Sequence, residues 1–289
     1  MIAMEDRDWR WLCRKVGAAP ARVYGAQLLC LAAACIFVRM RKLMRAGALF
    51  LASGIVAGFG AAPEPRLHLV GDSTMADKPK EPPNPETGWG QVLPQFFVDP
   101  TRIVNHAVNG RSTRSFIAEG KWQAVVDSLR AGDWVIIQFG HNDSKEDDST
   151  RYAAPRGAFQ ENLRRMVRDA RAHGATPLFA TPVARRRWNE KGEFYDVHGD
   201  YPDAMRDVAA AEGVRVLEMH RLTMDLVRAH GEEGSKRLFL HYPAGQFARK
   251  PEGYMDDTHF SEYGAWRVAS IAVQEIIRLG LPLAEWLKH

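Results

Sequence analysis

The chain from residue 66 onward alternates short apolar runs with longer amphipathic stretches. Trp134, Val135, Ile136 and Ile137 are apolar at successive positions, which is typical of a strand covered by helices on both faces. Alternation of such runs with helical stretches predicts βα units around a parallel sheet. Five runs have the length of a strand: residues 67–70, 102–107, 134–139, 176–181 and 214–219.

Two of the amphipathic stretches have clear helical periodicity. Between Phe159 and Ala170, apolar side chains recur at helical spacing, and arginines fill the other side as a solvated face. Residues 261–279 carry a second apolar stripe that a glycine and a proline terminate, so His259 lies directly before a helix start. These elements predict an α/β protein, a three-layer α/β/α sandwich with a five-stranded parallel sheet.

Ligands of such open sheets bind beyond the carboxyl ends of the strands, where the strand order reverses. We therefore expect the site to be built from the loops that follow the strands. These loops begin at Asp72, Val108, Gly140, Pro182 and His220.

A serine near the start of the region from residue 66 onward, and an aspartate and a histidine near its end, indicate nucleophilic chemistry. A serine hydroxyl needs a base within hydrogen-bond reach, and the base needs an acceptor that orients it. Ser73, His259 and Asp256 supply these groups, and Asp256 and His259 lie three residues apart in one predicted loop or turn. Asp257 competes for the acceptor role. Taken alone, Ser73 is equally consistent with a helix N-cap, and His259 with packing at the helix start.

Acyl transfer also needs donors aimed at the developing oxyanion. The Ser73 N–H is one candidate. Gly110 follows the second predicted strand, and glycine allows its backbone N–H to approach a ligand closely. Asn142 follows the third predicted strand and offers a side-chain N–H.

Together these residues resemble the SGNH (GDSL) hydrolases, whose nucleophile, two oxyanion donors and base match Ser73, Gly110, Asn142 and His259. Family spacing favours Asp256 over Asp257. The resemblance implies a flavodoxin-like SGNH hydrolase fold, covers nearly all of residues 66–280, and is greatest to the rhamnogalacturonan acetylesterase branch. The blocks that carry it are residues 71–76, 88–90, 105–107, 110–115, 132–133 and 139–143.

An arginine-rich segment follows the fourth predicted strand at the expected rim of the site. It contains Arg185, Arg186, Arg187 and Trp188. Guanidinium groups here are suited to binding galacturonate carboxylates, with the tryptophan stacked on a sugar. The alternative is a solvated charge run with one packing aromatic. Residues 185–198 align poorly with fungal members of the branch, whose disulfides are also absent here.

Several other polar residues are expected to be structural. Asp72 and Asp143 are interpreted as acceptors for loop N–H groups rather than catalytic acids. His106, His141 and His241 are interpreted as satisfied loop histidines. The acidic loop 143–148 is typical of a solvated segment, so we expect no metal site and no cofactor.

The net positive charge of the chain and all of its cysteines lie in residues 1–65. This leader carries a net charge of +5, from nine Lys/Arg and four Asp/Glu, whereas the remainder carries −1, which argues against a nucleic-acid surface. All three cysteines, Cys13, Cys30 and Cys35, also lie in the leader, so residues 66–289 can form neither a disulfide nor a thiolate metal site.

The leader has the composition of a signal peptide at residues 40–62, with a basic start, an apolar stretch and small residues for cleavage, followed by a short linker. An earlier apolar stretch, residues 23–38, is too short and interrupted for a confident membrane span. We therefore interpret residues 1–39 as a mis-assigned translation start, with a membrane anchor as the alternative. Residues 66–289 form the predicted catalytic domain, exported to the periplasm or beyond.

The sequence thus predicts a secreted serine esterase that removes acetyl groups from a plant cell-wall polysaccharide or oligosaccharide, in particular rhamnogalacturonan. No nucleic acid is expected as a partner, and a membrane only through an uncleaved leader; the oligomeric state is open. Two alternatives stand beside this function. One is an SGNH esterase for acetylxylan or for a lipid-like or short-chain ester, and the other is an inactive carbohydrate-binding domain on the same fold.

Overall fold

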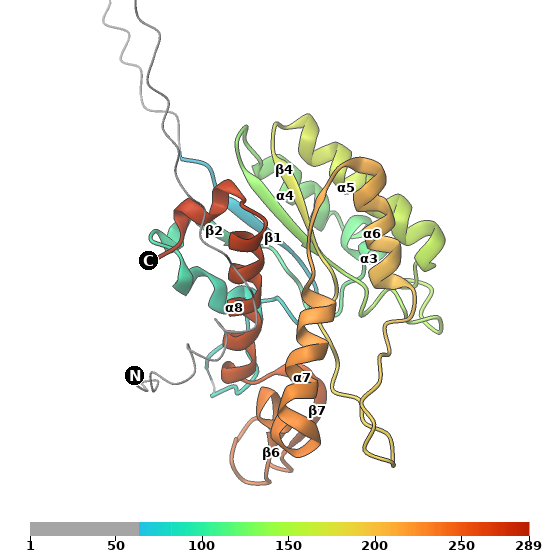
Figure 1. The fold of residues 1–289 in the computed structure, drawn as a ribbon, viewed down its shortest axis with the longest axis vertical. Helices are drawn as coiled ribbons and strands as arrows, with labels where there is room; N and C mark the ends of the chain where they lie inside the picture. The colour runs from blue at the N-terminus through green and yellow to red at the C-terminus, as the bar shows by residue number, and fades with distance from the viewer. Residues whose placement is uncertain (1–63, 82, 289) are drawn as a thin grey trace, which may run out of the picture. The chain divides into compact units, whose positions relative to one another are not determined.

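The computed structural model describes residues 64–81 and 83–288, and the predicted leader lies outside this part of the chain apart from its last two residues (Figure 1). Five parallel strands form the central sheet in the order β2-β1-β3-β4-β5. They are β1 (Leu67–Gly71), β2 (Ile103–Asn105), β3 (Trp134–Gln138), β4 (Thr176–Ala180) and β5 (Arg215–Leu217).

All five predicted strands are present, and β2 and β5 are shorter than the apolar runs that predicted them. From β1 the chain passes outward to β2, then returns across β1 to β3 and continues in that direction. The strand order therefore reverses at β1 and β3, which places the expected ligand site beyond the carboxyl ends of these two strands.

Helices cover both faces of the sheet, as predicted. In β3, the side chain of Ile136 packs on one face with α2, α7 and α8, whereas Val135 and Ile137 pack on the other face with α3 to α6. This arrangement explains why successive positions of β3 are apolar. Figure 1 shows α8 on one side of the sheet and α5 and α6 on the other. The helices are α2 (Trp89–Val92), α3 (Thr113–Ala118), α4 (Lys121–Ser128), α5 (Gln160–Ala172), α6 (Tyr201–Glu212), α7 (Met219–Ser235) and α8 (Glu262–Arg278).

Short turns complete the fold. A π-helical turn, Pro155–Phe159, leads into α5. The 3-10 turns are Leu93–Phe96, Pro100–Arg102, Lys236–Leu238 and Pro282–Trp286. No helix among the described residues is long and apolar enough to span a membrane.

A hairpin that sequence reasoning missed lies between α7 and α8. Its antiparallel strands are β6 (Phe239–Tyr242) and β7 (Tyr254–Phe260), and β7 carries both Asp256 and His259. The loop or turn expected for these two residues is therefore an irregular strand.

Candidate active site

Ser73 lies on a tight turn that β1 feeds. The Asp72 carbonyl accepts hydrogen bonds from the N–H groups of Met75, at 3.2 Å, and Ala76, at 3.0 Å. The buried Asp72 carboxylate accepts the Thr74 N–H and the Thr74 hydroxyl, both at 2.9 Å. Asp72 is thus a structural acceptor, as expected, and its bonds to the three residues after Ser73 fix the turn.

The segment around Trp89 packs against this turn and is hydrogen-bonded to it. The Trp89 N–H donates to the Thr74 carbonyl at 2.9 Å, and its indole N–H donates to Gln138 at 3.0 Å. Gln138 donates in turn to the Thr74 hydroxyl at 2.8 Å. A side chain at Gly88 would place its Cβ 2.1 Å from the Ala76 carbonyl oxygen, so only glycine fits beneath the turn. The family resemblance at residues 88–90 therefore has a steric cause.

A bulge in β7 brings Asp256 and His259 to one side of the hairpin. Phe260 pairs with Phe239, but the next residue of β6, Leu240, pairs with Asp256, so three residues of β7 bulge out of the ladder. The Asp256 carboxylate closes this bulge by accepting the N–H groups of Thr258, at 2.7 Å, and His259, at 3.0 Å. In a regular strand, residues three apart would face opposite sides.

The three residues predicted to act together are in direct contact. Nε2 of His259 lies 2.9 Å from Oγ of Ser73, and Nδ1 of His259 lies 2.7 Å from Oδ2 of Asp256. Ser261, the N-cap of α8, accepts the Gly264 N–H and fixes the helix start two residues after His259. Asp257, the competing acceptor, contacts arginines instead.

Electrostatics keep Asp256 ionised. Burial alone would raise the pKa of its carboxyl, but the hydrogen bond and the charge of His259, together with two backbone N–H groups, hold the pKa well below its usual range. For Asp72, burial is likewise outweighed, mainly by His141, and the pKa falls to about 2. Both carboxylates are therefore negative at neutral pH.

A pocket of about 440 Å³ opens over Ser73, and its lining includes Gly110, Asn142 and His259. Gly110 has a φ of +73°, a conformation that favours glycine. One amide hydrogen of Asn142 is used by a 3.0 Å bond to the Arg111 carbonyl, which orients the other. Within the described part of the chain, the N–H groups of Ser73 and Gly110 have no hydrogen-bond acceptor. The three predicted oxyanion donors thus line one cavity.

One wall of the pocket is cationic. Arg185 and Lys145 both line it, and burial lowers the pKa of each. Arg185 donates to the His141 carbonyl at 3.0 Å, while its Nε is buried without a partner among the described residues. A guanidinium group that lines a cavity is suited to an anionic ligand. Sequence reasoning missed Lys145, which it read as part of a solvated loop.

The pocket lining also includes Glu86, which the sequence analysis missed. Its carboxylate lies 4.0 Å from Nε2 of His259 and 2.7 Å from the buried Nζ of Lys78. Lys78 also donates to Asn109, another lining residue. No sequence motif includes Glu86, because its partner Lys78 lies eight residues away in a segment without regular secondary structure.

The other members of the arginine run have internal partners. The buried Arg186 guanidinium donates to Asp257 at 2.9 Å, to Ser235 at 3.1 Å and to the Glu232 carbonyl at 2.8 Å. Arg187 pairs with Asp257 at 3.3 Å. Trp188 packs against Phe194 and the core. Of the four predicted substrate contacts, the pocket lining therefore includes Arg185 alone, and the other three support the hairpin or the core.

The remaining polar residues also have internal partners. Asp143 accepts the Thr113 N–H at 2.9 Å and the Gly140 N–H at 3.1 Å, while burial raises its pKa to about 7. His106 contacts His68, and His241 contacts Asp257, as expected of satisfied histidines. His141 is hydrogen-bonded too, yet it also lines the pocket.

Comparison with known proteins agrees with this geometry. The model of the GDSL-like Lipase/Acylhydrolase family matches residues 69–267. The chain is 42% identical over 222 residues to rhamnogalacturonan acetylesterase RhgT of Bacillus subtilis, covering 77% of this chain and 94% of that protein. It is 33% identical over 219 residues to the probable rhamnogalacturonan acetylesterase YesY of the same organism, covering 76% and 95%.

A solved structure with the same fold is the crystal structure of protein YxiM from Bacillus subtilis, with a TM-score of 0.64 and 25% identity. The match covers 75% of this chain and 57% of that one. The chain therefore belongs to the GDSL-like lipase/acylhydrolase family, as the sequence predicted. It is a carboxylic ester hydrolase.

Proposed function

We propose that this protein is a secreted serine esterase that removes acetyl groups from rhamnogalacturonan. The observation that carries the proposal is the contact of Ser73, His259 and Asp256 beside a pocket with a cationic wall, in a chain 42% identical to a rhamnogalacturonan acetylesterase along 94% of that enzyme. A serine, an oriented imidazole and converging N–H donors are the parts that acyl transfer needs.

In the proposed reaction, Oγ of Ser73 attacks the acetyl carbonyl carbon while Nε2 of His259 accepts the hydroxyl proton. Asp256 orients the imidazole and stabilises its charged form. The N–H groups of Ser73, Gly110 and Asn142 bind the oxyanion. The bond to the sugar oxygen breaks as His259 returns the proton to that oxygen. Water then attacks the acetyl-serine and gives a proton to His259, which passes this proton to Oγ of Ser73 as the ester bond breaks and acetate leaves.

The cationic wall supports a pectic substrate. Galacturonate residues carry a carboxylate, and Arg185 and Lys145 bring two positive groups to the lining of the pocket. A lipid-like acyl chain would gain nothing from these charges. Acetylxylan lacks a backbone carboxylate that could pair with Arg185 and Lys145.

Release of acetate from polysaccharides and of p-nitrophenol from small esters tests the proposal. Parent and Ser73→Ala proteins are compared on acetylated rhamnogalacturonan, acetylated xylan and p-nitrophenyl esters of increasing chain length. We expect the highest kcat/KM on rhamnogalacturonan, and a loss of about 10⁴-fold or more in the variant. Faster turnover of xylan or of long-chain esters would assign the substrate differently. Polysaccharide binding without turnover would indicate a carbohydrate-binding domain.

Export is proposed from the leader composition at residues 40–62. N-terminal sequencing of protein recovered outside the cytoplasm tests it, and we expect a mature N-terminus close to residue 63. A mature N-terminus before residue 40 would contradict both the proposed cleavage and the proposed translation start.

A further inference from the structure

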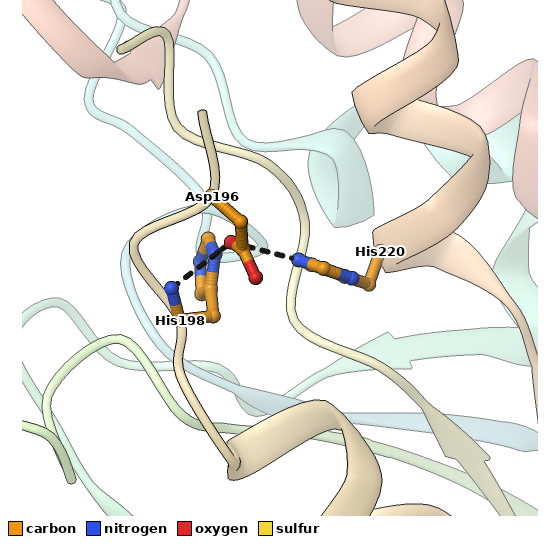
Figure 2. A group of neighbouring side chains, drawn as sticks. All are labelled: Asp196, His198 and His220. Atoms are coloured by element: carbon orange, nitrogen blue, oxygen red, sulfur yellow. Dashed lines mark hydrogen bonds and ion pairs between the residues drawn. The ribbon is translucent and has the colours of Figure 1, made fainter. Parts of the chain in front are cut away.

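Asp196, His198 and His220 point toward one another (Figure 2), and none of the three lines the active-site pocket. Nδ1 of His198 lies 2.9 Å from Oδ1 of Asp196, and Nε2 of His220 lies 3.0 Å from the same oxygen. One potential ligand atom from each residue lies within 4.8 Å of the others. His198 is buried, but 34% of the Asp196 side chain is exposed, so solvent reaches the cluster from one side.

When both histidine rings are neutral, this arrangement lacks one N–H donor. Nε2 of His198 lies 3.3 Å from Nε2 of His141, whose Nδ1 lies 3.2 Å from the Asp72 carboxylate. The row Asp72, His141, His198, Asp196 therefore contains three contacts, and each needs one N–H. Two neutral imidazoles carry only two N–H protons. Once His141 donates to Asp72 and His198 donates to His141, Nδ1 of His198 faces the Asp196 carboxylate with a lone pair.

A cation can take the place of the missing proton. Only 3% of the His198 side chain is exposed, and its Nδ1 lies 2.9 Å from the Asp196 carboxylate. A buried imidazole lone pair beside a carboxylate is a set of donor atoms for a cation.

We propose that Asp196, His198 and His220 bind a divalent transition-metal ion, with zinc as the best match. Imidazole and carboxylate groups are zinc ligands at about 2.0 to 2.1 Å, and water commonly fills a fourth position. Two such ligands lie about 2.9 Å apart at a right angle and about 3.4 Å apart at the tetrahedral angle. The observed separations of 2.9 and 3.0 Å need little adjustment to reach this range.

The proposed ion has a structural role that is separate from ester hydrolysis. It joins the segment between β4 and α6, which carries Asp196 and His198, to the first turn of α7, which carries His220. The remaining N–H of His198 then donates to His141 and fixes that ring against Asp72, beside the nucleophile turn.

Zinc binding to the full chain, produced without a polyhistidine tag, tests the proposal. Cys13, Cys30 and Cys35 are replaced by serine in every sample, so that thiolates do not contribute. After treatment with a chelator, Zn²⁺ is titrated calorimetrically, and metal content is measured after gel filtration. We expect one zinc ion per chain. Zinc at one hundred times its Kd should raise the Tm by about 5 to 10 °C.

Two ligand variants and one matched control localise the ion. His220→Ala should lower zinc affinity at least 100-fold, and Asp196→Asn, at a partly exposed position, at least tenfold. His230→Ala removes another histidine of α7, one that contacts the Leu226 carbonyl, and should keep the parent affinity. Circular dichroism checks that each variant is folded. A parent that binds no stoichiometric zinc, or folded ligand variants with the parent affinity, would overturn the proposal and leave the cluster as a hydrogen-bond network.

Discussion

Asp256 and Asp257 are neighbours in the chain, yet their carboxylates bind different residues. Asp256 lies 2.7 Å from Nδ1 of His259, whereas Asp257 lies 2.9 Å from Arg186 and 2.7 Å from His241. The bulge of β7 begins between the two residues, so their side chains point in different directions. The Asp256 carboxylate faces the candidate base, and the Asp257 carboxylate anchors the hairpin to the buried Arg186. The two residues should therefore respond differently to the same substitution.

Asp256→Asn should lower kcat on p-nitrophenyl acetate by about 10³- to 10⁴-fold, because an amide no longer stabilises the imidazolium. Asp257→Asn should lower kcat less than tenfold and instead lower the free energy of unfolding, by about 2 kcal/mol, because it weakens the ion pair of a buried arginine. Steady-state kinetics and urea unfolding measure the two effects. Equal losses of kcat would contradict the assignment of Asp256 as the partner of His259.

Gly88→Ala should destabilise the nucleophile turn. The new Cβ would meet the carbonyl oxygens of Ala76 at 2.1 Å and Met75 at 2.6 Å, and backbone atoms cannot rotate away as a flexible side chain can. We expect a loss of about 2 to 3 kcal/mol in the free energy of unfolding, with a fall in kcat as the turn shifts. Gly234→Ala is the control. Its Cβ would lie 3.7 Å from His230 in α7, and alanine favours helix, so stability should be kept or raised. Similar losses in the two variants would argue against the close approach at Gly88.

The sequence predicts the central sheet well because its strands are buried on both faces and read as apolar runs, as Val135 to Ile137 illustrate. The β7 strand was missed because it contains the polar residues 256–259 and bulges, so it shows no alternation. The candidate triad was predicted because its members lie in family motifs.

Ion pairs between residues far apart in the chain leave no comparable pattern in the sequence. Arg186 is buried and its partners lie 46 to 71 residues away, so the sequence cannot distinguish it from its neighbour Arg185 in the pocket wall. Asp196 and His198 were likewise separated by 22 or more residues from His220, and nothing in the sequence joins them. The folded chain alone shows which side chains of a charged segment meet.

Acid should destabilise the protein between about pH 6.5 and 4, partly through His106. Burial, and then the charge of His68, lower the pKa of His106 to about 4, so the folded chain holds this ring neutral. In this range the unfolded chain binds a proton that the folded chain does not, so the free energy of unfolding falls as the pH falls. The contribution is at most about 1.4 kcal/mol per pH unit.

His106→Gln should therefore flatten the dependence of stability on pH, measured by urea unfolding at pH 6.5 and 4.5. His198 shares the lowered pKa and remains, so part of the dependence should persist. His173→Gln replaces an exposed histidine and should keep the parent dependence. A His106→Gln protein with the full parent dependence would show that His106 is not held neutral.

Arg185→Gln should separate substrate recognition from chemistry. Arg185 lines the pocket, and a galacturonate carboxylate would pair with its guanidinium group, whereas p-nitrophenyl acetate has no carboxylate. We expect kcat/KM on acetylated rhamnogalacturonan to fall about 10- to 100-fold, mainly through KM, and kcat/KM on the small ester to change less than threefold.

Arg187→Gln is the control, because Arg187 belongs to the same run but pairs with Asp257 outside the pocket lining, and should spare both substrates. Added salt should weaken the parent on the polysaccharide and affect Arg185→Gln less, because it screens the same attraction. Equal losses on both substrates would mean that Arg185 acts through His141, whose carbonyl it contacts, rather than on the substrate.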